Sequence, residues 1–288
     1  DMDEAVWKEV LRSTLSDRGG HAMFLRRPEG MNWLKDLYDL GKTDPENWAA
    51  YQFTTLQGQN VPESEIEAAR RDLDERTFRQ EYEASFETYA GLIYYSFKDA
   101  NVQEVEPIKD NETILVGLDF NIDPLSAVVG VRRGNYLDIV DEIVIHGANT
   151  FDFCQELKRR YPKHRIEIYP DASGAQRRTS SNTTDHAILS NAGFTVRVNR
   201  TNPSVTDRIA SVNSRLATAS GEHYIRINKK CRTLIKCLTS QVYKSGTRIP
   251  EKGEFDHSND SLGYLTHWHW PIRRDVDTSD QPTYWSKY

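Results

Sequence analysis

Three short runs rich in β-branched and other apolar residues follow one another from residue 113, and they restrict the fold more than any other feature of the chain. They are 113–120 (TILVGLDF), 125–132 (LSAVVGVR) and 136–145 (YLDIVDEIVI). Gly134 and Asn135 form a turn signal between the last two runs. Runs of this length with tight connections predict consecutive antiparallel strands. We therefore expect a β-meander at the start of a sheet.

Helix and strand patterns alternate after residue 145. Helices are expected at 151–161, 184–191, 205–218, 232–241 and 257–268, and strands at 165–169 and 194–198. Such alternation adds parallel strands to a sheet and places helices over both of its faces. The two parts together predict an α/β fold with a mixed sheet, antiparallel meander plus parallel strands, flanked by helices.

The first hundred residues have a different, mostly helical pattern. Helices are expected at 5–15, 32–40 and 63–86, and the short apolar segment 21–25 is expected as a strand. The tract 99–111 is polar and contains Pro107, which is typical of a linker or domain boundary. We therefore predict a mostly helical segment, 1–98, followed by the α/β domain, 99–288.

Composition excludes several classes of protein. The 288 residues, 38% of them hydrophobic, suffice for one or two soluble domains. The chain has no run of eighteen apolar residues and its first thirty residues lack a secretory pattern, so neither a membrane span nor export is expected. Its three cysteines lack zinc-type spacing and are expected as buried thiols: Cys154, Cys231 and Cys237.

Charge is distributed unevenly along the chain. The net charge of −6 argues against a nucleic-acid partner, because phosphate binding depends largely on Lys and Arg. Residues 1–105, however, carry 12 basic and 21 acidic side chains, whereas residues 164–252 carry 15 basic and 6 acidic ones. The basic stretch is either a phosphate-facing surface or a set of solvated helix faces, and charge alone does not choose between them.

Four aspartates stand where a carboxylate needs a special reason. Asp119 lies in an apolar run, and burying an acid is costly unless it is paired, hydrogen-bonded or bound to a metal. Asp171 directly follows the strand 165–169, at the end where α/β sheets place ligands. Asp256 and Asp260 are four residues apart, so both project from one face of the last predicted helix.

Each aspartate also has a structural explanation when taken singly. Asp119 suits a strand-end cap, Asp171 a turn former and Asp256 a helix N-cap. Their order along the chain, strand, strand end and late helix, instead favours one oxygen-lined site. Carboxylates are the ligands that Mg²⁺ and Mn²⁺ prefer, and two such ions about 4 Å apart support in-line phosphoryl displacement.

Four motifs give the chain a family resemblance. They are VGLDF at 116–120, YPDAS at 169–173, VTDRIASVNSRL at 205–216 and FDHSNDSLGY at 255–264, the last being the most specific. Over more than half its length the chain thereby resembles the nuclease domain of the large terminase subunit of tailed bacteriophages. That resemblance implies a ribonuclease H-like fold. Ser261 and Gly263 depart from the family's usual D-A-L-R-Y.

The amino-terminal part resembles the end of the packaging ATPase domain of the same family. The resemblance lies in DEAVWKEVL at 3–11 and LSDRGGHAMF at 15–24, whereas RRPEG at 26–30 replaces the family's usual Thr-Pro. No G-x-x-x-x-G-K-[ST] phosphate loop is present, so we expect no ATP hydrolysis by this chain alone. A motor domain upstream of this sequence is the simplest account, and a free-standing nuclease is the alternative.

The resemblance implies an activity and a set of partners. It implies a two-metal endonuclease that cuts double-stranded viral DNA concatemers during packaging, with a terminase small subunit and a portal protein as partners. The location would be the cytoplasm of the host cell, for a viral or prophage-encoded protein. Ligation of Mg²⁺ or Mn²⁺ carries over to Asp119, Asp171 and one or both of Asp256 and Asp260. From its own position, His257 either orients a ligand or moves a proton, or it is a capping or packing residue at the helix start.

Basic side chains near these acids are expected to hold the DNA backbone without reading its sequence. They are Arg177, Arg178, Arg208, Lys229, Lys230, Arg232, Lys244 and Arg248. Two other functions remain open at this stage. One is another ribonuclease H-like enzyme, a junction resolvase or strand transferase, and the other is a non-catalytic domain that grips DNA or docks to the portal.

Overall fold

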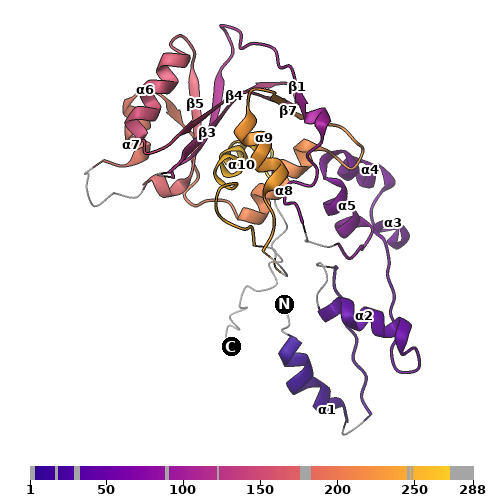
Figure 1. Ribbon diagram of the computed structural model, residues 1–288. Helices are drawn as coiled ribbons and strands as arrows, with labels where there is room; N and C mark the ends of the chain where they lie inside the picture. Colours follow the sequence, from indigo (N-terminus) through magenta and orange to yellow (C-terminus); the bar gives the residue numbers. More distant parts are fainter. Residues whose placement is uncertain are drawn as a thin grey trace, which may run out of the picture. The chain divides into compact units, whose positions relative to one another are not determined.

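The computed structural model describes residues 4–16, 19–28, 33–87, 91–121, 123–175, 183–244, 247 and 249–272. The chain separates into two compact units, Asp1–Ala90 and Gly91–Tyr288 (Figure 1). The sequence placed this boundary between residues 98 and 99.

The first unit consists of short helices. They are the π-helix η1 (Val6–Leu11) and the α-helices α1 (Arg12–Ser16), α2 (Trp33–Thr43), α3 (Thr55–Gly58), α4 (Glu63–Asp72) and α5 (Glu75–Tyr82). The single helix predicted for 63–86 is therefore wrong. Asp74 breaks it by capping α5, because its carboxylate accepts hydrogen bonds from the backbone N–H of Thr77 (3.0 Å) and from the Thr77 hydroxyl (2.7 Å).

The strand predicted for 21–25 is also wrong. Residues 21–25 have no regular secondary structure. Phe24 packs edge-on against two tryptophans instead, with ring centroids 4.7 Å from Trp7 and 5.8 Å from Trp33. Phe24 thus serves aromatic packing between helices, whereas its neighbours Met23 and Leu25 are exposed.

The second unit is built on a seven-stranded sheet. Its strands are β1 (Val102–Gln103), β2 (Ile114–Asp119), β3 (Leu125–Arg133), β4 (Tyr136–Ile145), β5 (Ile166–Pro170), β6 (Thr195–Val196) and β7 (Ile225–Asn228). Their order is β1-β7-β4-β3-β2-β5-β6. The β2–β3–β4 meander is antiparallel and every other pairing is parallel. The predicted mixed sheet is confirmed, and the short strands β1 and β7 were not predicted.

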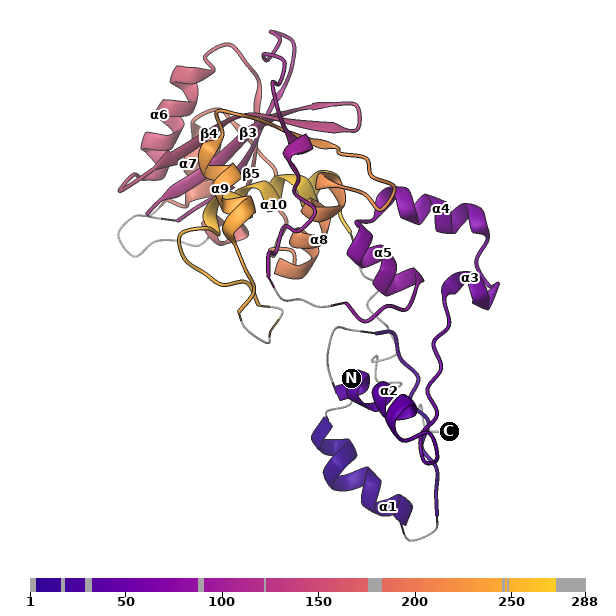
Figure 2. The same ribbon diagram turned by 45° about the vertical axis from the view of Figure 1, so that its right-hand side comes forward.

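Helices cover both faces of this sheet (Figures 1 and 2). One core includes residues of α6 (Thr150–Arg160) and α7 (Asp185–Asn191). The core on the other face includes residues of α8 (Val205–Leu216), α9 (Arg232–Ser240) and α10 (His257–His269). Successive β2 residues belong to opposite cores, Leu115 to the second and Val116 to the first. Since side chains alternate along a strand, Gly117 and Asp119 share the α8–α10 face with Leu115.

Gly117 lets α10 lie directly on the sheet. A Cβ atom at this position would stand 2.0 Å from the carbonyl oxygen of Ser261, a distance that real Cβ atoms do not adopt. The Ser261 hydroxyl donates a hydrogen bond to the Ser126 carbonyl oxygen of β3 (2.8 Å), and the hydroxyls of Ser126 and Ser258 are 2.9 Å apart. The start of α10 is therefore fixed against β2 and β3, next to Asp119.

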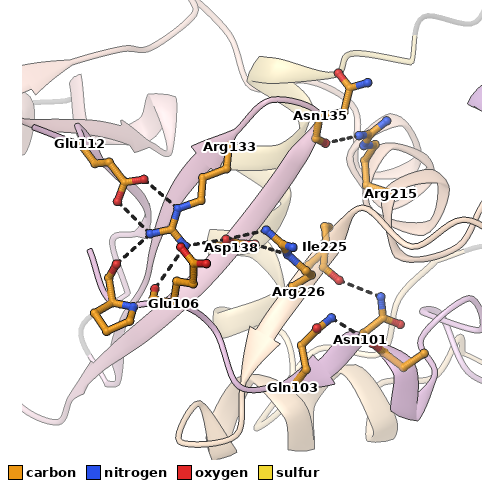
Figure 3. A network of polar contacts seen from close by, with 12 residues as sticks. Asn101, Gln103, Glu106, Glu112, Arg133, Asn135, Asp138, Arg215, Ile225 and Arg226 are labelled. Carbon is orange, nitrogen blue, oxygen red and sulfur yellow. Dashed lines mark hydrogen bonds and ion pairs between the residues drawn. The ribbon is translucent and has the colours of Figure 1, made fainter. Parts of the chain in front are cut away.

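A network of matched charges lies elsewhere in the same unit (Figure 3). Asp138 on β4 is 1% exposed and forms ion pairs with Arg133 (2.9 Å) and with Arg226 of β7 (2.5 Å). Arg133 also binds Glu112 through two hydrogen bonds of 2.7 and 2.8 Å, and it donates to the Glu106 carbonyl oxygen. This network ties the segment before β2 and the strand β7 to the meander.

The structure also describes the cysteines and the length of the helices. All three cysteines are free and buried, as predicted. Within the part of the chain that the structure describes, no helix is both long and apolar enough to span a bilayer.

Candidate metal-binding active site

Asp119 and Asp171 leave adjacent strands at the same edge of the sheet. Strands β2 and β5 are parallel, and Leu118 lies opposite Pro170 in their register. The backbone N–H of Asp171 donates to the Leu118 carbonyl oxygen at 3.1 Å, which continues the ladder by one residue. The parallel pairing therefore brings the two acids together although they are far apart in the sequence.

Asp171 is held by neutral groups. One carboxylate oxygen accepts hydrogen bonds from the backbone N–H of Ser173 (2.7 Å) and the side-chain amide of Asn202 (2.5 Å). The other accepts from the Ser173 hydroxyl at 3.0 Å. Among the described residues no Lys or Arg forms an ion pair with Asp171. It thus acts as a turn former and still presents an uncompensated negative charge.

Asp256 stands at the N-cap position of α10 but does not cap the helix with its side chain. It is 8% exposed, and its Oδ1 atom is buried without a hydrogen-bond partner among the residues that the structure describes. The nearest cationic group is His257, whose Nε2 lies 3.4 Å away. A buried carboxylate oxygen with no donor is unusual, because desolvating it without compensation is costly.

His257 lies between two of the acids. Its Nδ1 is 3.0 Å from Asp119 Oδ2, while its Nε2 faces Asp256. The hydrogen bond to Asp119 raises the pKa of His257, and the charge of Asp256 adds to this effect against the opposing influence of burial. The Asn121 amide also contacts the imidazole ring, 2.8 Å from Nε2. The imidazole therefore lies between Asp119 and Asp256 and links them.

Asp260 pairs with a buried arginine from α8. Arg208 is 6% exposed, donates a 2.7 Å hydrogen bond to Asp260 Oδ1, and places its guanidinium carbon 4.3 Å from the ring centroid of Tyr264. Burial nevertheless raises the pKa of Asp260, and the negative charges of Asp119 and Asp256 raise it further, which together outweigh Arg208. The arginine expected on the DNA surface thus belongs to the interior of the acidic site.

Tyr264 shows that the acids from three elements converge. Burial raises the pKa of its hydroxyl, and the charges of Asp171, Asp260 and Asp119 raise it as well. These aspartates come from the end of β5, from α10 and from β2. The strand, strand-end and helix positions seen in the sequence therefore lie in one part of the domain, near enough for their charges to act on the same hydroxyl.

The carboxylate oxygens of this site are the kind of ligand that a hard divalent cation prefers. Four carboxylates face two cationic side chains, Arg208 and His257, and one oxygen of Asp256 has no hydrogen-bond partner. Mg²⁺ and Mn²⁺ favour such oxygen ligands. Among the described residues, no group of three or more His, Cys, Asp or Glu side chains is arranged so that it could hold a metal ion. His257 and Arg208 hold three of the four acids instead.

The predicted DNA-contacting residues lie in several places. Lys229 and Lys230 precede α9 and lie 3.5 Å from Glu104 and Asp141, respectively. Arg232 is exposed on α9 and has no carboxylate partner in the described part of the chain, and Lys244 is exposed. The remaining predicted residues, Arg177, Arg178 and Arg248, lie outside the described residues.

Sequence reasoning missed the groups that hold the acids in place. Asn202 orients Asp171, Asn121 contacts His257, and Tyr264 lies among three carboxylates. Asn121 lies two residues after Asp119, so its closeness in sequence to a predicted ligand was a signal that could have identified it. Asn202 reaches Asp171 only through the folded chain, so its sequence position carries no such signal.

The chain is similar in sequence to a curated terminase, although no protein-family model matches it. It is 27% identical over 188 residues to the large terminase subunit of Escherichia phage T5, a match that covers 61% of this chain and 43% of that protein. The chain thus spans less than half the length of this relative. The predicted resemblance to large terminase subunits is confirmed.

Solved structures share its fold. The large terminase of a thermophilic bacteriophage matches 92% of this chain and 68% of its own, with a TM-score of 0.64 and 19% identity. The nuclease domain of the P22 large terminase matches 63% of this chain and 94% of its own, with a TM-score of 0.51 and 12% identity. The predicted ribonuclease H-like architecture, a mixed sheet flanked by helices, is confirmed.

Proposed function

We propose that this relative of a phage large terminase subunit is a metal-dependent endonuclease that cuts double-stranded viral DNA during genome packaging. The observation that carries the proposal is the surplus of carboxylates at the sheet edge: Asp119 and Asp171 leave adjacent strands there, and α10, which carries Asp260, packs on β2. Such a surplus is stable only with a bound cation or with raised carboxyl pKa values, and Asp260 shows the raised pKa.

Asp119, Asp171 and Asp260 are the proposed ligands of Mg²⁺ or Mn²⁺, two ions in all. Bound metal supplies an activated water and neutralises charge on the phosphate. Asp260 takes precedence over Asp256 as the third ligand because its side chain is more exposed, 33% against 12%. Asp256 then adds negative charge and holds His257 from its far side.

The neighbouring side chains have positioning roles in this proposal. Arg208 fixes the rotamer of Asp260 through its hydrogen bond and its stacking on Tyr264. Asn202 and Ser173 fix Asp171, and His257 fixes Asp119. Residues that orient metal ligands in this way matter because ligand geometry sets metal affinity.

The substrate proposal is duplex DNA held through its phosphates. Lys229, Lys230, Arg232 and Lys244 offer exposed positive charge, and Arg177, Arg178 and Arg248 remain sequence-based candidates. A terminase small subunit, a portal protein and the host cytoplasm belong to the proposal through the relationship to terminases. The terminase of the thermophilic bacteriophage was also solved in complex with ADP, but this chain has no phosphate-loop motif, so we propose no ATPase activity for it alone.

Cutting of supercoiled plasmid tests the proposed function. The purified chain is incubated with Mn²⁺, with Mg²⁺ or with excess chelator, beside Asp171→Asn and the matched control Asp110→Asn, an exposed aspartate of the segment before β2. The proposal expects cutting by the wild type and the control that needs metal and disappears in Asp171→Asn. Equal cutting by Asp171→Asn, or cutting in chelator, would contradict it.

A further inference from the structure

A cavity of about 650 Å³ opens beside the acidic site. His257, which contacts Asp119, is one of its lining residues, so this side of the cavity lies one side chain away from Asp119. One wall is the exposed side of α9, with Arg232 and Lys236 four residues apart. Residues this far apart on a helix lie on the same face. The volume falls in the range of about 300–1,000 Å³ that is typical of ligand clefts.

The backbone of α9 is not free to bind an anion in this cavity. The Glu142 carboxylate accepts hydrogen bonds from the N–H groups of Thr233 (2.9 Å) and Leu234 (2.8 Å) at the start of the helix. An anion in the cavity must therefore be held by side chains. Arg232 and Lys236 are the fixed cations that the cavity offers.

The two cations of α9 differ in their present partners. Lys236 Nζ lies 2.5 Å from Glu254 Oε1 and 5.1 Å from the ring centroid of Phe255, both in the segment that leads into α10. Arg232 has no carboxylate partner among the described residues. The other acid of the lining, Asp123, is 2.6 Å from His146 on the opposite wall. Glu254 therefore occupies the place beside Lys236 that an incoming anion needs.

We propose that this cavity seats the DNA phosphodiester backbone next to the cut, and that Glu254 competes with phosphate for Lys236. The inference rests on the proposed function for the identity of its ligand as DNA. A polyanion suits the site because Arg232 and Lys236 line the same cavity as His257, which contacts Asp119. Glu254 lowers DNA affinity by the strength of one exposed ion pair, which is small but sufficient to tune binding.

Duplex binding without metal tests the competition. Anisotropy of a labelled short duplex is measured in chelator over a series of salt concentrations, with the full chain. Arg232→Gln and Lys236→Gln are each expected to weaken binding and to reduce the slope of log K against log salt concentration by about 0.9, one phosphate contact each. Lys163→Gln, an exposed lysine in the turn between α6 and β5, is the control and should bind as the wild type does.

Glu254→Gln is expected to tighten binding by up to about fivefold, the equivalent of one exposed ion pair. Glu251→Gln, an exposed acid of the same segment, controls for net charge and should change affinity less. The gain must vanish in the Lys236→Gln background, as a double-mutant cycle requires. A gain that persists there, or wild-type binding by Arg232→Gln and Lys236→Gln, overturns the inference.

The binding and cleavage results separate the two proposals. If the variants bind as expected but the wild type never cuts DNA, the phosphate seat stands and the nuclease proposal fails. If the wild type cuts with metal but none of the cavity variants alters binding, the nuclease proposal stands and this inference fails.

Discussion

Two clusters of charged side chains in the second unit differ in their charge balance. One has as many acidic as basic groups, and the other has more acidic than basic groups. In the network of Figure 3, the carboxylates of Glu112 and Asp138 face the guanidinium groups of Arg133 and Arg226. The hydrogen bond from Arg133 lowers the pKa of Glu112 to about 2. In the acidic site, four aspartates face Arg208 and His257, and the pKa of Asp260 is raised.

The first cluster stabilises the fold, whereas the second keeps negative charge that a bound ligand could neutralise. Matched charges satisfy one another, so the first cluster needs nothing from outside and fixes the segment before β2 and strand β7 to the meander. The acidic site keeps a negative surplus although burial opposes it, and a folded chain retains such a surplus at a cost in stability.

The largest expected effect is the loss of cutting in Asp260→Asn. The amide still accepts the Arg208 hydrogen bond but is a poor metal ligand, so cleavage should fall by about 100- to 1,000-fold. Urea unfolding should show little change in the free energy of unfolding. A variant that keeps its cleavage rate would remove Asp260 from the proposed ligands.

Arg133→Met should show the opposite pattern. It leaves the buried Asp138 with one partner fewer and Glu112 with none of its Arg133 bonds, so the free energy of unfolding should fall by about 3 kcal/mol. Cleavage by the fraction that remains folded should be unchanged. Loss of cutting without loss of stability would erase the distinction between the two clusters.

Arg208→Lys sharpens the role of the arginine inside the acidic site. Lysine keeps the charge but not the planar group that stacks on Tyr264 while binding Asp260. We expect cleavage to fall by about tenfold, mainly through a higher Mn²⁺ requirement. Mn²⁺ titrations of the cleavage rate measure this, and a loss confined to the rate at saturating Mn²⁺ would argue against a positioning role.

The smallest expected effect is the pH dependence of the stability that Glu112 contributes. Because its folded pKa is lowered, its contribution to stability is present above the unfolded pKa of about 4.3 and is lost as pH falls towards about 2. Glu112→Gln should therefore be less stable than the wild type near neutral pH, by about 1–2 kcal/mol. Urea unfolding at a series of pH values should show that this difference in the free energy of unfolding becomes smaller below about pH 4. A gap that is constant with pH would mean that the ion pair contributes little.

The sequence predicted the sheet best where the chain is most apolar. Strands β2, β3 and β4 matched their predicted runs closely, since each buries several β-branched residues. Strands β1 and β7 are two and four residues long and gain their pairing only from neighbours distant in sequence. The break at Asp74 was missed because a single capping side chain outweighed a continuous helical pattern.

The candidate site was predictable in its acids and not in their partners. Asp119 and Asp171 could be identified because Asp119 lies in an apolar predicted strand and Asp171 follows the end of another predicted strand. The burial of Arg208 depends on the packing of α8 against α10, where its guanidinium carbon lies 4.3 Å from the ring centroid of Tyr264. Such packing between helices has no local signature, which is why a buried arginine was expected at the surface.

Calorimetric titration with Mn²⁺ tests the central claim most directly, because it measures cation binding without any DNA. The wild type and Glu112→Gln should both bind Mn²⁺, and the double variant Asp119→Asn/Asp260→Asn should lose that binding while it stays folded. Absence of binding in the wild type, or binding that survives in the double variant, would show that the carboxylate surplus is not a metal site.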